Sequence, residues 1–176
     1  MKWFNKIVEM VKSIFGTQKP EIATTEQTPA PVSQEPSTPE IDEDIDIMAR
    51  TLWGEARSED VQGMQAVACV IMNRYRENIW YSKHKGEHSI KAVCLKPMQF
   101  SCWNDNDPNA EMCAKVDTKD RRFVQALEIA AAAKAGKLED FTNGANHYFA
   151  DYIPKPKWAE GMQFCITIGR HNFYRG

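Results

Sequence analysis

Trp53-Gly-Glu-Ala-Arg57 stands where the first helix of the globular part is expected to end. Four apolar residues before it recur at the spacing of one helical face, namely Ile41, Ile45, Met48 and Leu52. Because glycine commonly ends helices, the pattern predicts a helix that stops near Gly54 and leaves Glu55 beside a cleft. Trp53 is expected to line that cleft, and an apolar wall beside a carboxyl group favours its protonated form.

Glu55 in that position is a candidate general acid. Cleavage of a glycosidic bond requires a carboxylic acid, because the leaving oxygen must receive a proton. The same residues also allow a solvated surface glutamate that pairs with Arg50 or Arg57, since most glutamates lie at surfaces. The pentapeptide alone leaves both interpretations open.

Seven further elements are expected after the pentapeptide. Periodicity predicts helices at 60–76, 89–95 and 118–137, and strands at 98–103, 146–150, 162–168 and 171–174. Alternation within 162–168 places four residues on its buried face: Met162, Phe164, Ile166 and Ile168. Glu59 and Asp60 are assigned to the start of the second helix, where acidic side chains are favourable. The sum is an α+β domain of about 130 residues that is dominated by helices.

Polar and aromatic residues gather in three segments: Met98-Gln-Phe-Ser101, His147-Tyr-Phe149 and His171-Asn-Phe-Tyr174. Carbohydrate sites combine flat apolar surfaces with donors and acceptors that fix the orientation of a sugar. Each segment is equally compatible with an ordinary edge strand or with core.

Five segments follow one another along the globular part: 49–57, 65–74, 97–101, 145–149 and 167–174. They contain Gly54-Glu-Ala56, Pro97-Met-Gln-Phe-Ser101 and Ile168-Gly-Arg-His171. In this order they resemble the cell wall hydrolase family of SleB type, whose best-known members are spore cortex-lytic enzymes. The resemblance covers roughly 45–175, which is the whole globular part.

The resemblance implies a lysozyme-like α+β fold and a lytic transglycosylase that cleaves the MurNAc-GlcNAc bond of peptidoglycan. The glutamate of the family's Gly-Glu-Ala motif, the catalytic acid/base, corresponds to Glu55. Carried over as candidate substrate-binding residues are Gln99, Phe100, Ser101, His147, Tyr148 and Tyr174. A transglycosylase needs one carboxyl group, whereas most glycosidases use two. No cofactor is expected.

Two other functions stay open for the same domain. One is a hydrolytic muramidase of lysozyme type, and the other is a non-catalytic murein-binding or virion structural module. A cysteine peptidase is disfavoured, because no cysteine stands at a helix start after a loop, where a thiolate is stabilised. Four-residue spacing of His84 and His88 in a basic loop is a poor zinc motif, so no metal site is expected.

The five cysteines give a conditional prediction. Cys69 lies among apolar residues and is expected to be a buried thiol. In an oxidising envelope, a disulfide could join Cys102 to Cys113 or Cys94 to Cys102. The odd number leaves one cysteine unpaired.

The chain before the globular part falls into two segments. In residues 1–16, apolar residues recur at the spacing of one helical face and lysines fill the other, which predicts an amphipathic helix. Such a helix binds a membrane surface or a partner protein, or docks on its own domain. Residues 17–41 are rich in proline, threonine and acidic residues, which predicts a disordered linker. The catalytic domain is then 42–176. With a net charge of -2, a basic nucleic-acid binder is disfavoured.

The sequence also suggests where the protein acts. Residues 1–16 have neither the unbroken apolar run nor the nearby small-residue cleavage site of a secretory signal. The family's spore members normally carry such a signal and a separate wall-binding module. We therefore expect a phage lysis enzyme made in the host cytoplasm, or one delivered by another route, that acts in the bacterial cell wall or periplasm.

Overall fold

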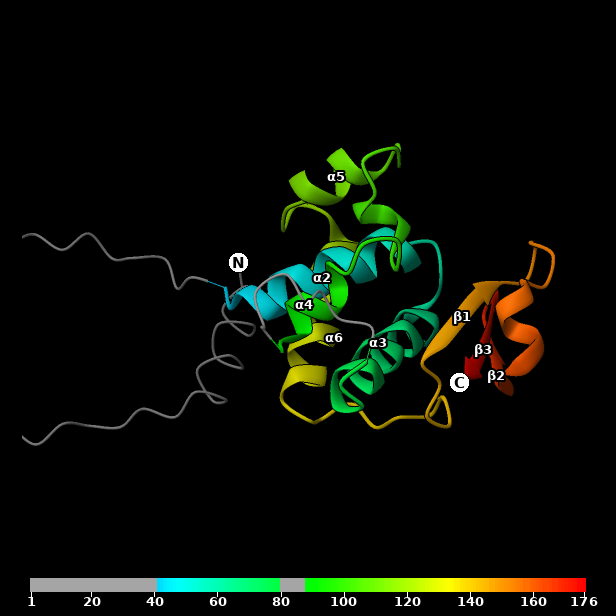
Figure 1. The fold of residues 1–176 in the computed structure, drawn as a ribbon. Coiled ribbons are helices and arrows are strands. Elements are labelled where there is room, and N and C mark those ends of the chain that lie inside the picture. Colours follow the sequence, from blue (N-terminus) through cyan, green and yellow to red (C-terminus); the bar gives the residue numbers. More distant parts are fainter. Residues whose placement is uncertain (1–40, 80–87) are drawn as a thin grey trace, which may run out of the picture. The chain divides into compact units, whose positions relative to one another are not determined.

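The computed structural model describes residues 41–79 and 88–176. The predicted helix at 1–16, the predicted linker at 17–41 apart from Ile41, and His84 lie outside these residues. Residues 41–176 form one compact unit, drawn in Figure 1. Its elements are α2 (Glu43–Ala56), α3 (Val61–Arg76), α4 (Ile90–Cys94), η1 (Ser101–Trp103), α5 (Ala110–Lys115), α6 (Arg121–Lys134), β1 (His147–Ala150), η2 (Lys157–Gly161), β2 (Gln163–Ile168) and β3 (His171–Arg175).

Side-chain caps fix where four of the helices begin. Asp42 accepts hydrogen bonds from the first turn of α2, and Asp60 accepts one from Gly63 in α3 at 2.7 Å. Ser89 and Asp120 do the same for α4 and α6. Such caps satisfy backbone donors that have no partner within the helix. The predicted helices at 60–76 and 89–95 are confirmed, and α6 starts later than predicted because Asp120 is its cap.

The predicted end of the first helix at Gly54 is wrong. Helix α2 continues to Ala56, and the glycine has a different reason to be there. A Cβ atom on Gly54 would lie 2.5 Å from the Cβ atom of Cys102. The missing side chain therefore lets η1 approach the last turn of α2 closely.

The predicted strand at 98–103 is also wrong. Met98 has a φ of 63° and is exposed, and the segment ends in the short 3₁₀ helix η1. Its polar groups bond to α2 instead of to a neighbouring strand. The Trp103 indole donates to the Thr51 hydroxyl at 2.9 Å, and the Cys102 amide donates to Glu55.

Helix α5, which local sequence patterns did not predict, is held by α2. The Arg50 guanidinium donates to the carbonyl oxygens of Cys113, Ala114 and Val116 at 2.8 to 3.1 Å. Those carbonyls belong to the end of α5 and would otherwise lack partners. A tertiary contact therefore stabilises this short helix, which its own sequence marks only weakly.

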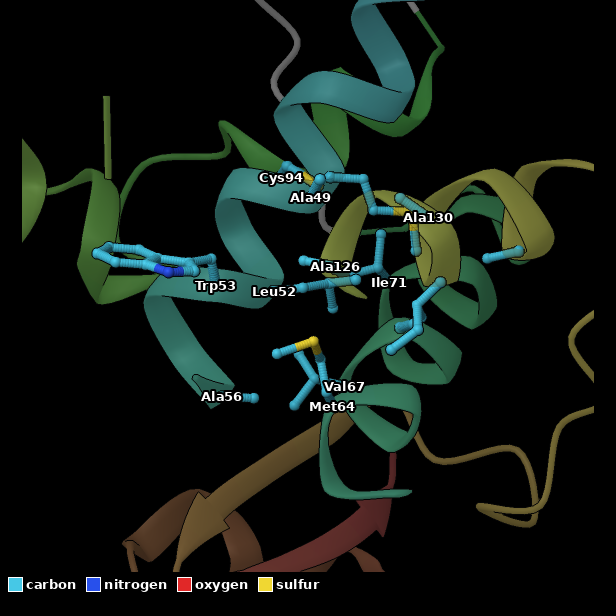
Figure 2. Close-up of a cluster of buried hydrophobic side chains, with 14 of the residues drawn as sticks. Ala49, Leu52, Trp53, Ala56, Met64, Val67, Ile71, Cys94, Ala126 and Ala130 are labelled. Carbon is cyan, nitrogen blue, oxygen red and sulfur yellow. The ribbon is translucent and has the colours of Figure 1, made fainter. Parts of the chain in front are cut away.

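The main core lies between α2, α3 and α6. Leu52, Val67 and Ile71 are fully buried and lie together in Figure 2, with Ala126 and Ala130 of α6 beside them. Small side chains on α6 allow a close approach of the helices, so the alanine-rich segment forms part of the core. Burial of such apolar surface provides the main stabilisation of the unit.

The three strands form an antiparallel sheet in the order β1-β3-β2. In its register, Tyr148 lies opposite Phe173 and His147 lies opposite Tyr174. Since successive side chains of a strand point to opposite faces, Tyr148 and His147 lie on different faces of the sheet. The predicted helix-dominated α+β fold with a small sheet is confirmed.

Strand β2 departs from the predicted alternation at Phe164. The register with β3 is interrupted between Phe164 and Ile166, as in a β-bulge, and the Phe164 side chain is exposed. The bulge shifts the pattern by one residue. Ile168, beyond the bulge, is buried as predicted.

The structure has all five cysteines as thiols. Cys102 and Cys113 hydrogen-bond to each other through their side chains, whereas Cys94 is buried beside Thr51. Burial raises the pKa of the Cys94 thiol to about 12. A disulfide stays a prediction, and the contact favours the pair Cys102 and Cys113 over Cys94 and Cys102.

Candidate active site

Glu55 receives three hydrogen bonds from two other elements of the fold. Its Oε1 atom accepts from the Cys102 amide at 3.2 Å and from the Ser101 hydroxyl at 3.4 Å, both in η1. Its Oε2 atom accepts from the Tyr148 hydroxyl of β1 at 3.0 Å. The last turn of α2 therefore holds a carboxyl group whose orientation is fixed from both sides.

The two arginines that the sequence offered as partners of Glu55 bind elsewhere. Arg50 bonds to Asp46 at 2.8 Å and to the end of α5. Arg57 bonds to Asn109 at 2.8 Å, and its guanidinium lies 4.5 Å from the centre of the Trp53 ring. The interpretation of Glu55 as a surface glutamate paired with Arg50 or Arg57 is therefore wrong.

Glu55 opens onto a pocket of about 300 Å³. This volume is at the lower end of the range for small-molecule sites. Three segments of the fold contribute: the turn after α2, the connection after β1 and the turn between β2 and β3. The lining residues are Glu55, Ser58, Glu59, Tyr152, Arg170 and His171.

Trp53 does not line this pocket, contrary to the prediction. Residues two positions apart in a helix point to nearly opposite sides, so Trp53 and Glu55 cannot share a face. Figure 2 shows the Trp53 ring directed away from Leu52 and Val67. Its apolar surface is covered by Arg57 instead.

Glu59 joins the helical part to the sheet at the pocket. It directly precedes Asp60, which caps α3, and so lies at the helix start to which it was assigned. Its Oε2 atom accepts from the Arg170 amide at 3.0 Å and lies against Gly169, whose φ is +55°. Because L side chains rarely adopt this backbone conformation, a substitution at residue 169 would be strained, which favours glycine there.

Arg122 of α6 fixes the turn that carries Glu59. Its guanidinium donates to the carbonyl oxygen of Arg57 at 3.0 Å and also to that of Glu59. The turn between α2 and α3 is therefore bound to a long helix on one side and to the sheet on the other. The pocket wall that faces Glu55 is held in place by these contacts.

Burial shifts the pKa values of two side chains beside Glu55. Burial, and then the Glu55 charge, raise the pKa of Tyr148 well above its usual range, so the hydroxyl stays protonated. Burial lowers the pKa of His171, which keeps the imidazole neutral near pH 7. The His171 Nδ1 atom is buried and has no hydrogen-bond partner among the described residues.

Arg74 is a buried cation on the protein side of the site. Its Nε atom donates to the carbonyl oxygen of Asn146 at 2.7 Å, and the guanidinium lies 5.2 Å from the centre of the Phe100 ring. Burial lowers its pKa, while Tyr148, Cys94 and Glu55 act in the opposite direction. The sequence suggested only a favourable charge at a helix end, and the buried location was missed.

The structure divides the predicted substrate-binding residues into three groups. Ser101 and Tyr148 lie at Glu55. Phe100 is fully buried beneath Arg74, and the half-buried Gln99 is not among the pocket-lining residues. His147 and Tyr174, which point to the face of the sheet opposite Tyr148, form the third group.

The third group belongs to an aromatic cluster around Trp158. The ring of Trp158 lies 5.4 Å from His147, 5.8 Å from Phe149 and 6.1 Å from Tyr174, measured between centroids. Phe149 and Tyr174 are buried in this cluster. It closes the face of the sheet that α3 does not cover, and it lies away from Glu55.

Four residues at the site were missed by sequence reasoning as members of a cleft: Ser58, Glu59, Tyr152 and Arg170. His171 belongs to a segment that was named as a candidate carbohydrate site. The available signal was weak. Gly169-Arg170 marked a turn between two strands, and turns at the end of a sheet often carry functional groups. Which turn meets Glu55, however, depends on long-range contacts that no local pattern reports.

Neither a metal cluster nor a membrane-spanning helix is found in the described part of the chain. Its residues contain no group of three or more histidine, cysteine, aspartate or glutamate side chains that could hold a metal ion. Among the same residues, no helix has the length and apolar character needed to cross a membrane.

Replacing Tyr148 by Phe is expected to lower the activity of the site about tenfold. The change removes a hydrogen bond to a group that is charged during part of the reaction, and it keeps the ring in place. Steady-state rates on peptidoglycan, the substrate that the resemblance implies, would measure the loss. Ser101→Ala is the matched comparison, because its longer bond of 3.4 Å predicts a smaller loss. Equal rates for wild type and Tyr148→Phe would contradict this role.

Acidification is expected to destabilise the fold partly through His147. Burial, and then the charge of Arg74, lower the pKa of His147 from 6.5 to about 4. On acidification the unfolded chain therefore binds the proton first. The stability that the neutral His147 contributes is fully present above about pH 6.5 and is lost as the pH falls toward 4. Calorimetric melting temperatures between about pH 7 and pH 5 should decline less steeply for His147→Gln. Parallel declines for both proteins would contradict the assignment.

Comparison with known proteins identifies a matching family and several relatives of this chain. The family described as Cell Wall Hydrolase matches residues 58–174, which begins just after Glu55. A spore cortex-lytic enzyme of Halalkalibacterium halodurans is 28% identical over 132 residues, or 75% of this chain and 34% of that protein. The cell wall hydrolase CwlJ of Bacillus subtilis is 42% identical over 57 residues, or 32% of this chain and 39% of that protein. The chain thus spans about a third of the length of the curated relatives that it matches.

Two solved structures resemble the described unit. The catalytic domain of the Bacillus cereus SleB protein has a TM-score of 0.56 and 26% identity, over 75% of this chain and 89% of that one. The catalytic domain of the germination-specific lytic transglycosylase SleB from Bacillus anthracis has a TM-score of 0.56 and 25% identity, over 83% of this chain and all of that one.

Proposed function

Because the chain belongs to the cell wall hydrolase family, we propose that it cleaves the glycan strand of peptidoglycan with Glu55 as its catalytic acid/base. The observation that carries the proposal is the environment of Glu55. Both carboxyl oxygens are oriented by hydrogen bonds, from η1 and from β1, and the group still opens onto a pocket. A general acid needs both the fixed orientation and the access to substrate.

In the first step, the protonated Glu55 gives its proton to the oxygen of the bond between the muramyl sugar and the next glucosamine. The bond from the muramyl C1 atom to that oxygen breaks, and the alcohol of the leaving sugar departs. Positive charge then develops at the muramyl C1 atom, and the carboxylate of Glu55 remains beside it. Tyr148 and the Cys102 amide stabilise this carboxylate by donating hydrogen bonds.

In the second step, the Glu55 carboxylate takes the proton of the muramyl C6 hydroxyl. The C6 oxygen attacks C1 and forms a 1,6-anhydro ring, so the acid is restored and no water is consumed. One carboxyl group therefore serves both steps, which is the lytic transglycosylase mechanism. The similar SleB domain from Bacillus anthracis belongs to a protein described as a lytic transglycosylase, which supports this choice.

Glu59 supports a second candidate, a hydrolytic muramidase on the same substrate. It lines the pocket with Glu55 and could activate a water molecule as a second carboxylate. We favour the transglycosylase, because one Glu59 oxygen is already bound to the Arg170 amide and packed on Gly169. A carboxylate held in this way serves better to position the turn between β2 and β3.

Mass spectrometry of digested murein separates the two mechanisms. The transglycosylase produces 1,6-anhydro ends, and Glu59→Gln should keep that product type even if its rate falls. Reducing ends that disappear in Glu59→Gln would establish the hydrolase instead. If neither product forms with several purified mureins, the non-catalytic murein-binding module would be the function instead.

The setting of the activity belongs to the same proposal. We place the enzyme in the bacterial cell wall, during phage lysis or another form of wall degradation. Binding of residues 1–16 to a membrane surface or a partner protein stays a prediction, which liposome co-sedimentation with and without those residues would test.

A further inference from the structure

Arg170 has a fixed backbone and an open side chain at the pocket. It follows Gly169 in the turn between β2 and β3, and its amide is bound to Glu59 at 3.0 Å. Its side chain, by contrast, is 64% exposed and lines the pocket beside Glu55. The turn therefore delivers a guanidinium group to the substrate side of the catalytic carboxyl.

Two neighbouring side chains orient the guanidinium group of Arg170. Its carbon lies 4.8 Å from the centre of the exposed Tyr152 ring, and its Nε atom lies 3.6 Å from the Asp151 carboxylate. Its two terminal nitrogens make no hydrogen bond to the residues that the structure describes. These two nitrogens form the planar fork with which an arginine binds a carboxylate through two parallel hydrogen bonds.

Arg170 is also the positive group among the described residues that line the pocket. Glu55 and Glu59 are acidic, and His171 is neutral because burial lowers its pKa. Without Arg170, these acids and Asp151 would repel an anionic substrate. A positive side chain at this point changes which substrates the pocket accepts.

We propose that Arg170 binds a carboxylate that the peptidoglycan strand carries next to the scissile bond. This assignment rests on the function proposed above. Muramyl residues carry such a group in two forms: the free lactyl carboxylate where the peptide is absent, or the carboxylates of the stem peptide where it is present. Oligomers of N-acetylglucosamine carry neither. Arg170 is thus a specificity-determining residue, and Glu59 positions it through its amide.

Soluble murein fragments of three kinds test the proposal: peptide-bearing fragments, fragments freed of peptide by an amidase, and fragments whose carboxylates are converted to methylamides. Arg170→Gln should raise KM about tenfold on carboxylate-bearing fragments and leave kcat within about twofold. Arg170→Lys keeps the charge without the planar fork. Its KM should lie between those of wild type and Arg170→Gln. On methylamide fragments, wild type and Arg170→Gln should have equal KM values. Arg121→Gln, an exposed change at the start of α6, is the matched control.

The same fragments distinguish the two sources of the carboxylate. Dependence on Arg170 with peptide-free fragments alone assigns the lactyl group, and dependence with peptide-bearing fragments alone assigns the stem peptide. Either result supports the proposal. Equal KM values for wild type and Arg170→Gln on both kinds of fragment would overturn it.

Calorimetric binding to Glu55→Gln keeps this test separate from the proposed catalysis. In that background, the added Arg170→Gln change should raise Kd for carboxylate-bearing fragments about tenfold. An unchanged Kd would refute carboxylate binding even if the enzyme cleaves murein. Binding that depends on Arg170, combined with a wild-type protein that does not cleave murein, would count against the proposed function alone.

Discussion

Glu55→Gln is expected to lower the rate of glycan cleavage about a thousandfold and to leave the fold intact. General acid/base catalysis contributes on this scale, and an amide can neither give nor take the proton. The amide keeps the size of the side chain. Its oxygen can still accept from the Cys102 amide, and its NH₂ group can donate to the Tyr148 hydroxyl. Turbidity loss of purified murein measures activity, and circular dichroism measures folding.

The matched control is Glu59→Gln, which changes the other acid of the pocket. Its loss should be far smaller, because its function is to hold the Arg170 amide. Full activity of Glu55→Gln would exclude Glu55 as the acid and leave Glu59 as the remaining acid that lines the pocket. A comparable loss in both variants would favour the two-carboxylate hydrolase.

Gly54→Ala is expected to damage stability and activity together. In most helices this change stabilises by up to about 1 kcal/mol. Here the new Cβ atom would lie 2.5 Å from the Cys102 Cβ and 2.8 Å from its sulfur, so η1 must move. Overpacking of this kind costs about 1 to 3 kcal/mol, which exceeds the helical gain.

The same displacement moves the Cys102 amide and the Ser101 hydroxyl away from Glu55. Misplacement of a catalytic group by about 1 Å can reduce activity about a hundredfold, and we expect a loss of that order. Urea unfolding and cleavage assays measure the two effects. Gly161→Ala is the control, because no atom lies within 4 Å of its added Cβ. A Gly54→Ala protein more stable than wild type and fully active would show that η1 is not tightly fitted to α2.

The positions of α3 and α4 could be predicted because their signals are local. Asp60 and Ser89 cap the helices that periodicity placed there, and the five ordered segments correctly identified the SleB-type family. The segment 98–103 was misassigned because aromatic residues suggested a strand. Its structure is decided instead by Thr51 and Glu55, which lie about fifty positions earlier in the chain.

The candidate site could be predicted only in part. The resemblance identified Glu55, and Ser101 and Tyr148 do contact it. The resemblance did not indicate that His147 and Tyr148, neighbours in sequence, point to opposite faces of the sheet. Arg170 was missed because its proximity to Glu55 depends on how the turn between β2 and β3 meets Glu59. Such a contact joins residues far apart in sequence.

The pairing of β1 with β3 has a consequence for the preparation of active protein. Tyr148 reaches Glu55 only while it lies opposite Phe173. A slip of one residue would direct His147 toward Glu55 and Tyr148 toward Trp158, and most of the helical core would remain unchanged. Refolded material could then have normal helical content and no tyrosine hydroxyl bound to Glu55. Specific activity therefore reports correct strand pairing in refolded protein, which the helical signal of circular dichroism does not.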